Sequence, residues 1–145
     1  MTVAKAYLLD VNFLVALAWP NHVNHISARS WFHQHIQESF ATCPITESGF
    51  ARISMNPLVV GEQVSLPAAL DLLATYQSKY NFSFWQDDLP LSALSNFRNV
   101  SGHRQVTDAY LLALAKTHNG WLVTFDGGIA ALGPEGYRDS VVLVR

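Results

Sequence analysis

The sequence of 145 residues contains a single cysteine, Cys43, which excludes a disulfide framework and favours a reducing compartment. Cys43 lies in an apolar stretch, so we expect a buried and unreactive thiol. No stretch approaches the ~18 consecutive apolar residues that indicate a membrane-spanning helix. No signal-peptide pattern precedes the first apolar run. We therefore expect a cytoplasmic protein without a membrane partner.

Charged residues are also scarce, at 14% of the chain, whereas 50% of the residues are hydrophobic. The formal net charge of −2 excludes a broad basic surface, so any contact with nucleic acid must depend on a few local cations. So little charge cannot cover the surface of a small monomer, which favours a buried surface shared with a second copy or another protein. An unusually apolar core would explain the same composition.

No repeat, low-complexity tract or linker divides the chain, and its length predicts a single domain over residues 1–145. Short apolar segments typical of strands alternate with longer segments of helical periodicity. This order predicts an α/β fold with a mostly parallel central sheet and helices on both faces. The pattern also predicts helices over residues 22–38, 46–56 and 92–100, the second of them capped by Thr46.

Four acidic residues lie at points that such a fold would bring to one edge of its sheet. Asp10 and Asp126 each end a predicted strand, Glu47 begins a helix, and Asp108 lies in the first turn of a later helix. Because strand-to-helix junctions of a parallel sheet open on the same edge, we expect the four carboxylates to share one cleft. Taken alone, each could instead be an ordinary capping or turn residue.

Four carboxylates that lie close together cannot all stay ionised without a compensating cation. An oxygen-only set favours Mg²⁺ or Mn²⁺ over Zn²⁺, and such an ion can activate water and orient a phosphate. Hydrolysis of a phosphodiester is the reaction class that fits. Asn12 can cap the following helix or orient Asp10, and Thr124 projects to the same side as Asp126.

Other polar groups have less support as sites. The adjacent Asp87 and Asp88 precede a Leu-Pro pair, so we expect them in a solvated loop outside the site. The histidines of residues 22–38 have no acid or cysteine at ligand spacing, and their separation from the four acids disfavours a histidine-pair ribonuclease. An aspartyl-phosphate phosphotransferase usually needs a second acid where this chain has Asn12, and a late lysine, whereas none follows Lys116.

The segments around the four acids resemble the motifs of PIN-domain ribonucleases, and in particular those of the VapC toxins of bacterial type II toxin–antitoxin systems. The matching segments occur in family order, at residues 8–12 (LLDVN), 46–52 (TESGFAR), 107–111 (TDAYL) and 124–126 (TFD). The resemblance implies a PIN-like three-layer fold and a toxin that cleaves single-stranded RNA with Mg²⁺ or Mn²⁺. It implies a catalytic and metal-binding set supported by Asn12 and Thr124, namely Asp10, Glu47, Asp108 and Asp126.

The resemblance also implies two protein partners, a cognate VapB-type antitoxin that inserts a segment beside the acids, and a second copy in a homodimer. For contacts with RNA phosphates we consider Arg52, which follows Glu47, and Arg104, in the loop before Asp108. Either arginine could instead pair with a site acid when no metal is bound. The alternative from another class is a catalytically silent interaction module, whose acids hold a structural metal or an arginine-bearing partner.

Overall fold

The computed structural model describes residues 5–145, and its centre is a sheet in which every neighbouring pair of strands is parallel. The five strands lie in the order β3-β2-β1-β4-β5. Their bounds are Ala6–Leu9 for β1, Ser39–Thr42 for β2, Phe82–Phe84 for β3, Trp121–Thr124 for β4 and Val141–Leu143 for β5. The predicted α/β fold with a parallel sheet is confirmed.

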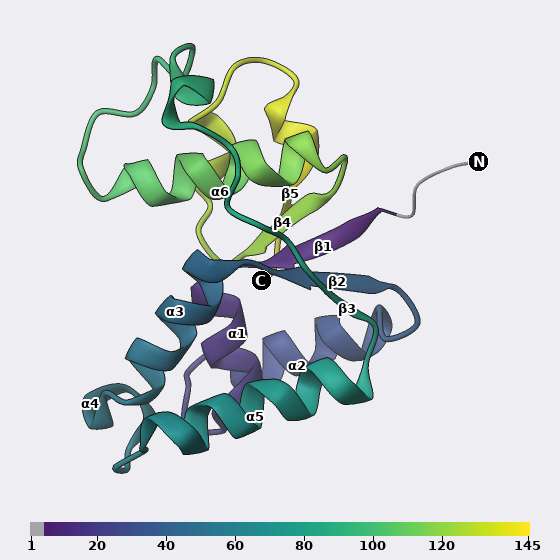
Figure 1. Cartoon of the computed structure of the whole chain (residues 1–145), viewed down its shortest axis with the longest axis vertical. Coiled ribbons are helices and arrows are strands. Elements are labelled where there is room, and N and C mark those ends of the chain that lie inside the picture. Colours follow the sequence, from purple (N-terminus) through teal and green to yellow (C-terminus); the bar gives the residue numbers. More distant parts are fainter. Residues whose placement is uncertain (1–4) are drawn as a thin grey trace.

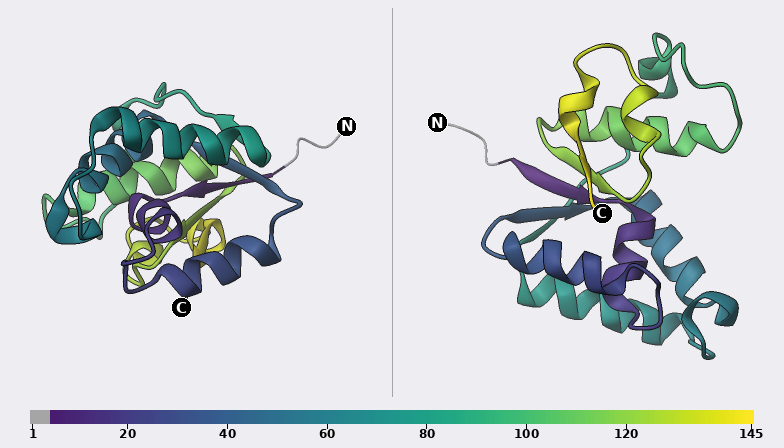
Figure 2. Two further views of the ribbon diagram at one scale, coloured as in Figure 1. Left: turned by 90° about the horizontal axis from the view of Figure 1, so that it is seen from below. Right: turned by 180° about the vertical axis from the view of Figure 1, so that it is seen from behind.

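Helices cover both faces of this sheet, as Figure 1 shows. One face carries α1 (Val11–Ala18), α2 (His25–Gln34), α3 (Pro44–Ser54), the short α4 (Pro57–Val60) and α5 (Leu66–Lys79). The other face carries α6 (Gln105–Thr117) and three short 3-10 turns, η1 (Leu91–Leu94), η2 (Ile129–Ala131) and η3 (Tyr137–Ser140). The C-terminal residues 143–145 lie beside α2, since they line a pocket together with Trp31 and Gln34 of that helix (Figure 2). None of the helices formed by residues 5–145 has the length and hydrophobicity to cross a membrane.

Alternating side chains of the strands divide the hydrophobic core into two layers. Leu8 belongs to the layer under α6, whereas its neighbour Leu9 belongs to the layer under α1, α2 and α5. In the second layer Phe32 of α2 stacks on Phe40 of β2, with 4.5 Å between the ring centroids. Both faces of the central strand β1 are therefore buried, which explains its unbroken apolar sequence.

The order of the strands changes direction between β1 and β4. From β1 the chain continues to β2 and β3 on one side, and it then returns through α6 to β4 and β5 on the other. In open α/β sheets the ligand lies beyond the carboxyl ends of the strands at such a switch point. Asp10 directly follows β1, and Asp126 follows β4 by two residues. The fold therefore positions both carboxylates where this class of protein binds its ligands.

The start of α3 differs from the prediction. The helix begins at Pro44 instead of Thr46, since proline lacks an amide hydrogen and suits the first helical position. Thr46 is the third helical residue, and its hydroxyl oxygen accepts a hydrogen bond from the Cys43 backbone N–H at 2.9 Å. Cys43 itself is buried, as predicted. Glu47 consequently lies one turn further into the helix than the sequence pattern indicated.

Two other predicted helices are shorter or absent. The helix predicted over residues 22–38 spans only His25–Gln34. Residues 92–100 do not form a helix, because the segment contains a single 3-10 turn, Leu91–Leu94, followed by irregular chain. Phe97 holds this segment in place, since its buried ring packs edge-on against Tyr137 with 5.1 Å between the centroids. Short helices are marginal in water, so tertiary contacts decide the local conformation.

Gly120, in the turn between α6 and β4, provides a test of the packing. A Cβ at this position would overlap the Ala6 carbonyl oxygen and contact the Trp85 ring at 3.0 Å. We expect Gly120→Ala to lower the free energy of unfolding by about 2 kcal/mol, because backbone must shift to relieve the overlap. Urea denaturation measures this change. Gly102→Ala, which meets open space, is the matched control, and an equal loss in both variants would contradict the packing explanation.

Candidate functional site at the carboxyl ends of β1 and β4

The Asp10 carboxylate has a fixed orientation at the end of β1. Its Oδ1 accepts a hydrogen bond from the Val11 backbone N–H at 2.8 Å, and its Oδ2 accepts one from the Thr124 hydroxyl at 2.7 Å. Burial raises the pKa of Asp10, the two hydrogen bonds lower it, and the charge of nearby Asp126 raises it. Asp10 therefore caps α1 and also belongs to a wider polar network.

Thr124 connects the polar groups of this network. Its oxygen accepts hydrogen bonds from the Asp126 backbone N–H at 3.0 Å and from Asn12 Nδ2 at 3.4 Å. The amide oxygen of Asn12, Oδ1, is buried and has no hydrogen-bond partner within residues 5–145. A buried acceptor without a partner is costly, so Asn12 presents an unsatisfied oxygen in the network that holds Asp10.

Asp108, in the first turn of α6, is the third acid at this edge. Burial raises its pKa to about 6, and the charges of Asp10 and Asp126 contribute to the rise. Within the described part of the chain the only basic side chain within ion-pair distance of an acid is His35, 3.9 Å from Glu38, so none of the described cations is paired with these aspartates. The structure therefore brings three of the four predicted acids into electrostatic contact and leaves their charge uncompensated.

Glu47 is held in a separate network on the face of the sheet that carries α5. Its Oε2 accepts hydrogen bonds from the Thr42 hydroxyl at 2.7 Å and from Gln77 Nε2 at 2.9 Å. Gln77 also donates to Thr42 Oγ1 at 3.3 Å, which closes a ring of contacts between α3, β2 and α5. Thr42 follows Phe40 by two positions, so both side chains point toward the layer of α2 and α5. In this conformation Glu47 does not join the aspartates.

The donor atoms at this edge suit a hard divalent cation. They are carboxylate oxygens and the Asn12 amide oxygen, with no thiolate among them. As they stand, no three His, Cys, Asp or Glu side chains among residues 5–145 lie close enough together to hold one ion. The unpartnered oxygen and the repulsion between the aspartates thus fit a cation chemically, and binding it would require the carboxylates to draw together.

A cleft of about 360 Å³ lies beside the aspartates, between the N-terminal ends of α1, α3 and α6. Arg52, Thr107 and Asp87 contribute polar groups to its lining. Burial raises the pKa of Asp87, a hydrogen bond from Cys43 lowers it, and the neighbouring Asp88 raises it. Asp87, predicted to lie outside the site, is therefore part of the cleft. The signal that could have indicated this is its position just after β3, whose carboxyl end opens on the same edge.

Comparison with known proteins places this site in a family context. Residues 7–133 match the model of the PIN domain family. The chain is 46% identical to Ribonuclease VapC39 of Mycobacterium tuberculosis over 125 residues, which are 85% of this chain and 90% of that protein. It is 40% identical to Ribonuclease VapC38 of the same species over 137 residues, which are 94% of this chain and 96% of that protein.

Two solved structures share the fold at low sequence identity. One is Mycobacterium tuberculosis VapC20, described as a sarcin-ricin loop cleaving toxin, with a TM-score of 0.65 and 16% identity over 88% of this chain and 95% of that chain. The other is a protein from Pyrobaculum aerophilum, with a TM-score of 0.59 and 22% identity over 95% of this chain and 83% of that chain. At these identities the likeness concerns the arrangement of the chain alone.

Asp108 should oppose folding when it is ionised in metal-free protein. Its pKa rises from 3.8 to about 6 on folding, so the folded state holds the proton more tightly and stability falls as the pH rises through this window. We expect Asp108→Asn to increase the free energy of unfolding at pH well above 6 by about 1 kcal/mol, a figure that allows for solvent screening. At pH below 4 the gain should vanish.

Urea unfolding in EDTA at the two pH values measures this difference. Asp71→Asn, at an exposed acid on α5, is the matched control and should change stability little at either pH. If Asp108→Asn stabilises the protein equally at low and high pH, charge repulsion is not the cause.

Proposed function

Because the chain belongs to the PIN-domain family and is similar to VapC ribonucleases over most of its length, we propose that it is an endoribonuclease toxin that cleaves single-stranded RNA with Mg²⁺ or Mn²⁺. The observation that carries this proposal is the group of three aspartates at the switch point of the sheet, whose charge no cation among residues 5–145 compensates. Phosphodiester hydrolysis is the chemistry that a divalent cation at such an edge supports.

The proposed ligands of the ion are three carboxylates and one amide oxygen, those of Asp10, Asp108, Asp126 and Asn12. When bound, the ion supplies an activated water and stabilises negative charge on the phosphate. The chain's own contribution is orientation. Thr124 fixes Asp10 and Asn12, and the Gly128 backbone N–H donates to Asp126 Oδ1 at 2.8 Å. Preorganised ligands of this kind reduce the cost of assembling the site on binding.

Glu47 is the fourth acid of the set that the family resemblance implies, and we keep it in the proposed set under one condition. Its carboxylate must first give up the hydrogen bonds from Thr42 and Gln77. These two bonds hold the Glu47 side chain in place without help from a metal. We therefore propose that Glu47 joins the site after the aspartates have bound the ion.

The metal-dependent mechanism predicts that EDTA abolishes cleavage of a labelled single-stranded RNA and that Mn²⁺ restores it. Asp10→Asn should lower kcat/KM by about 100-fold or more, because it removes a charged ligand of the ion. The same variant should lose the increase in melting temperature that Mn²⁺ gives the unsubstituted protein. Asp71→Asn, at an exposed acid on α5, should behave like the unsubstituted protein.

Undiminished cleavage in EDTA would contradict this mechanism. Binding of Mn²⁺ at Asp10 without cleavage of any RNA tested would favour the silent interaction module instead. The two readouts therefore separate the loss of the ion from the loss of the reaction.

Two exposed arginines are the proposed contacts for RNA phosphates. Arg52 lines the cleft beside the aspartates, and Arg104 immediately precedes α6, four residues before Asp108. Neither forms an ion pair with an acid among residues 5–145, so the guanidinium groups are available to phosphate. This contrasts with the alternative in which an arginine neutralises the site acids.

Substitution of these arginines should separate phosphate binding from metal binding. We expect Arg52→Ala and Arg104→Ala each to lower kcat/KM about tenfold, the loss of roughly one charge-assisted hydrogen bond, with the midpoint of Mn²⁺ activation unchanged. Arg138→Ala, at an exposed arginine of η3, is the control and should leave both quantities unchanged. Full activity of either cleft variant would remove that arginine from the proposed site.

We also propose that a cognate VapB-type antitoxin neutralises the toxin by covering an apolar groove next to Glu47 and Arg52. The groove has a volume of about 770 Å³ and lies between α3, α5 and β3. Its exposed apolar side chains are Met55, Leu66, Leu70 and Phe84. An exposed apolar patch of this kind is typical of a protein interface. The homodimer that the family resemblance implies stays a prediction.

A further inference from the structure

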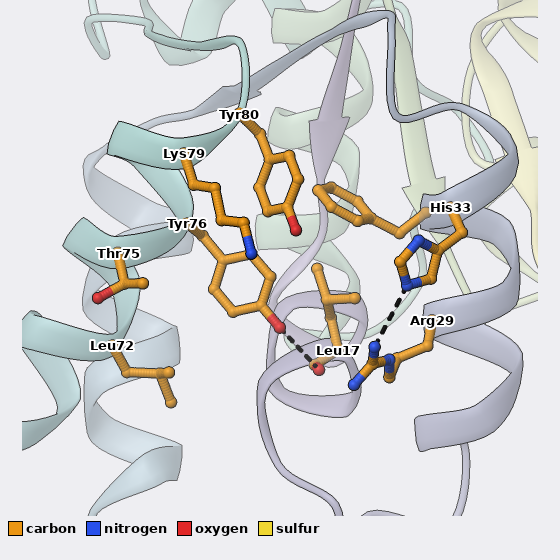
Figure 3. Close-up of a pocket in the computed structure, with 9 residues that line it drawn as sticks. Leu17, Arg29, His33, Leu72, Thr75, Tyr76, Lys79 and Tyr80 are labelled. Carbon is orange, nitrogen blue, oxygen red and sulfur yellow. Dashed lines mark hydrogen bonds between the residues drawn. The ribbon is translucent and has the colours of Figure 1, made fainter.

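A separate pocket lies between α2 and α5, on the face of the sheet that carries α1 (Figure 3). Its volume is about 260 Å³, and it shares no lining residue with the cleft beside the aspartates. Buried Phe32 and Leu17 are among the residues that line it. The pocket is therefore a distinct feature that the proposed cleavage of RNA does not use.

The pocket combines two cations with no acid. Arg29 on α2 and Lys79 on α5 lie on opposite walls in Figure 3, and no Asp or Glu lines the space between them. Neither side chain forms an ion pair within the described residues. In a chain with 9 Lys and Arg against 11 Asp and Glu, two facing cations without a counter-ion are a local excess of positive charge. Such an excess attracts an anion.

Hydrogen bonds leave much of this positive charge available. Arg29 Nη2 donates a hydrogen bond to His33 Nε2 at 3.2 Å. This contact brings no negative charge to the guanidinium group. Arg29 has further N–H groups in its guanidinium fork, a geometry that matches a phosphate. Burial raises the pKa of Tyr76, and the charge of Arg29 opposes this rise, so the charge acts on the interior of the pocket.

Aromatic rings surround the space between the two cations. Tyr80 packs edge-on against Phe32 with 4.9 Å between the centroids, and Lys79 Nζ lies 5.5 Å from the Tyr80 ring. The Tyr76 ring points into the same space, and its hydroxyl donates to the Leu17 carbonyl oxygen at 3.3 Å (Figure 3). Flat aromatic surfaces beside cations are the combination that binds a base by stacking and a phosphate by charge.

We propose that this pocket binds a nucleoside monophosphate, either as a free nucleotide or as the 5′-terminal nucleotide of an RNA strand. The phosphate lies between Arg29 and Lys79, and the base packs against the Tyr76 and Tyr80 rings. The volume of about 260 Å³ is just below the usual range for ligand pockets, about 300–1,000 Å³, and limits the ligand to one nucleotide unit. Because the pocket is separate from the aspartates, binding does not depend on the proposed nuclease reaction.

Equilibrium dialysis with AMP in EDTA tests this proposal, since chelation prevents a metal from recruiting the phosphate to the aspartates. We expect saturable binding that Arg29→Gln and Lys79→Gln each weaken about tenfold, a change of about 1.4 kcal/mol. Both side chains are exposed, so the variants should keep the thermal stability of the unsubstituted protein. Arg138→Gln removes an exposed cation outside the pocket and should not change the affinity.

Further ligands distinguish the parts of the nucleotide and its source. Adenosine and inorganic phosphate should each bind about tenfold more weakly than AMP, because each lacks half of the contacts. The strand end is the ligand if a short RNA with a 5′-phosphate binds more tightly than AMP and more tightly than its own 5′-hydroxyl form. The free nucleotide is the ligand if AMP binds more tightly than the RNA with a 5′-phosphate. The proposal is overturned by three results: no saturable binding of AMP, equal binding of AMP and phosphate, or affinity unchanged in both pocket variants.

Discussion

The hydrogen bond from the Thr124 hydroxyl to Asp10 Oδ2 is the contact on which the acidic edge depends. It is 2.7 Å long and buried, and it joins the ends of β1 and β4 across the centre of the sheet. A hydroxyl has one proton to donate and two lone pairs to accept with. Because the proton goes to Asp10, the lone pairs accept from the Asp126 backbone and from Asn12. One side chain therefore fixes the positions of two other side chains and one backbone amide.

This arrangement has a cost that the rest of the fold must offset. Burial disfavours the ionised form of Asp10, and burial together with the charges of Asp10 and Asp126 raises the pKa of Asp108 to about 6. Carboxylates with pKa values raised in this way are found at functional sites, where a ligand later relieves the repulsion. The two apolar layers on either side of the sheet supply the stability that permits it, since the central strands are buried on both faces.

The parts of the site that follow from the parallel sheet were predictable from the sequence. Asp10 and Asp126 end apolar runs, and Asp108 lies in the first turn of a strongly periodic helix, so the edge of the sheet gathers them. Glu47 was not predictable in the same way. Its orientation depends on the start of α3 at Pro44 and on Gln77, which comes from a helix 30 residues further along the chain. No local pattern contains such a long-range contact.

The local sequence around Asp87 likewise did not indicate which part of the fold it faces. Its Leu-Pro neighbours indicate a loop, which is correct, but a loop that follows β3 also borders the cleft. Polarity and turn residues describe the local conformation of a segment, whereas the topology of the sheet decides what the segment faces. The missing information was therefore the place of β3 in the sheet, not the chemistry of the residue.

The composition gives the net charge of the chain but not the positions of its charges in the fold. A net charge of −2 gives no long-range attraction for RNA, and the acidic edge repels phosphate until a cation is bound. If the protein cleaves RNA as proposed, recognition must depend on short-range contacts, from the ion and the arginines of the cleft. Arg29 and Lys79 face each other only because α2 packs beside α5, so their excess charge arises from tertiary structure. A chain with few charges can thus keep an anion-repelling edge and an anion-attracting pocket apart on one small domain.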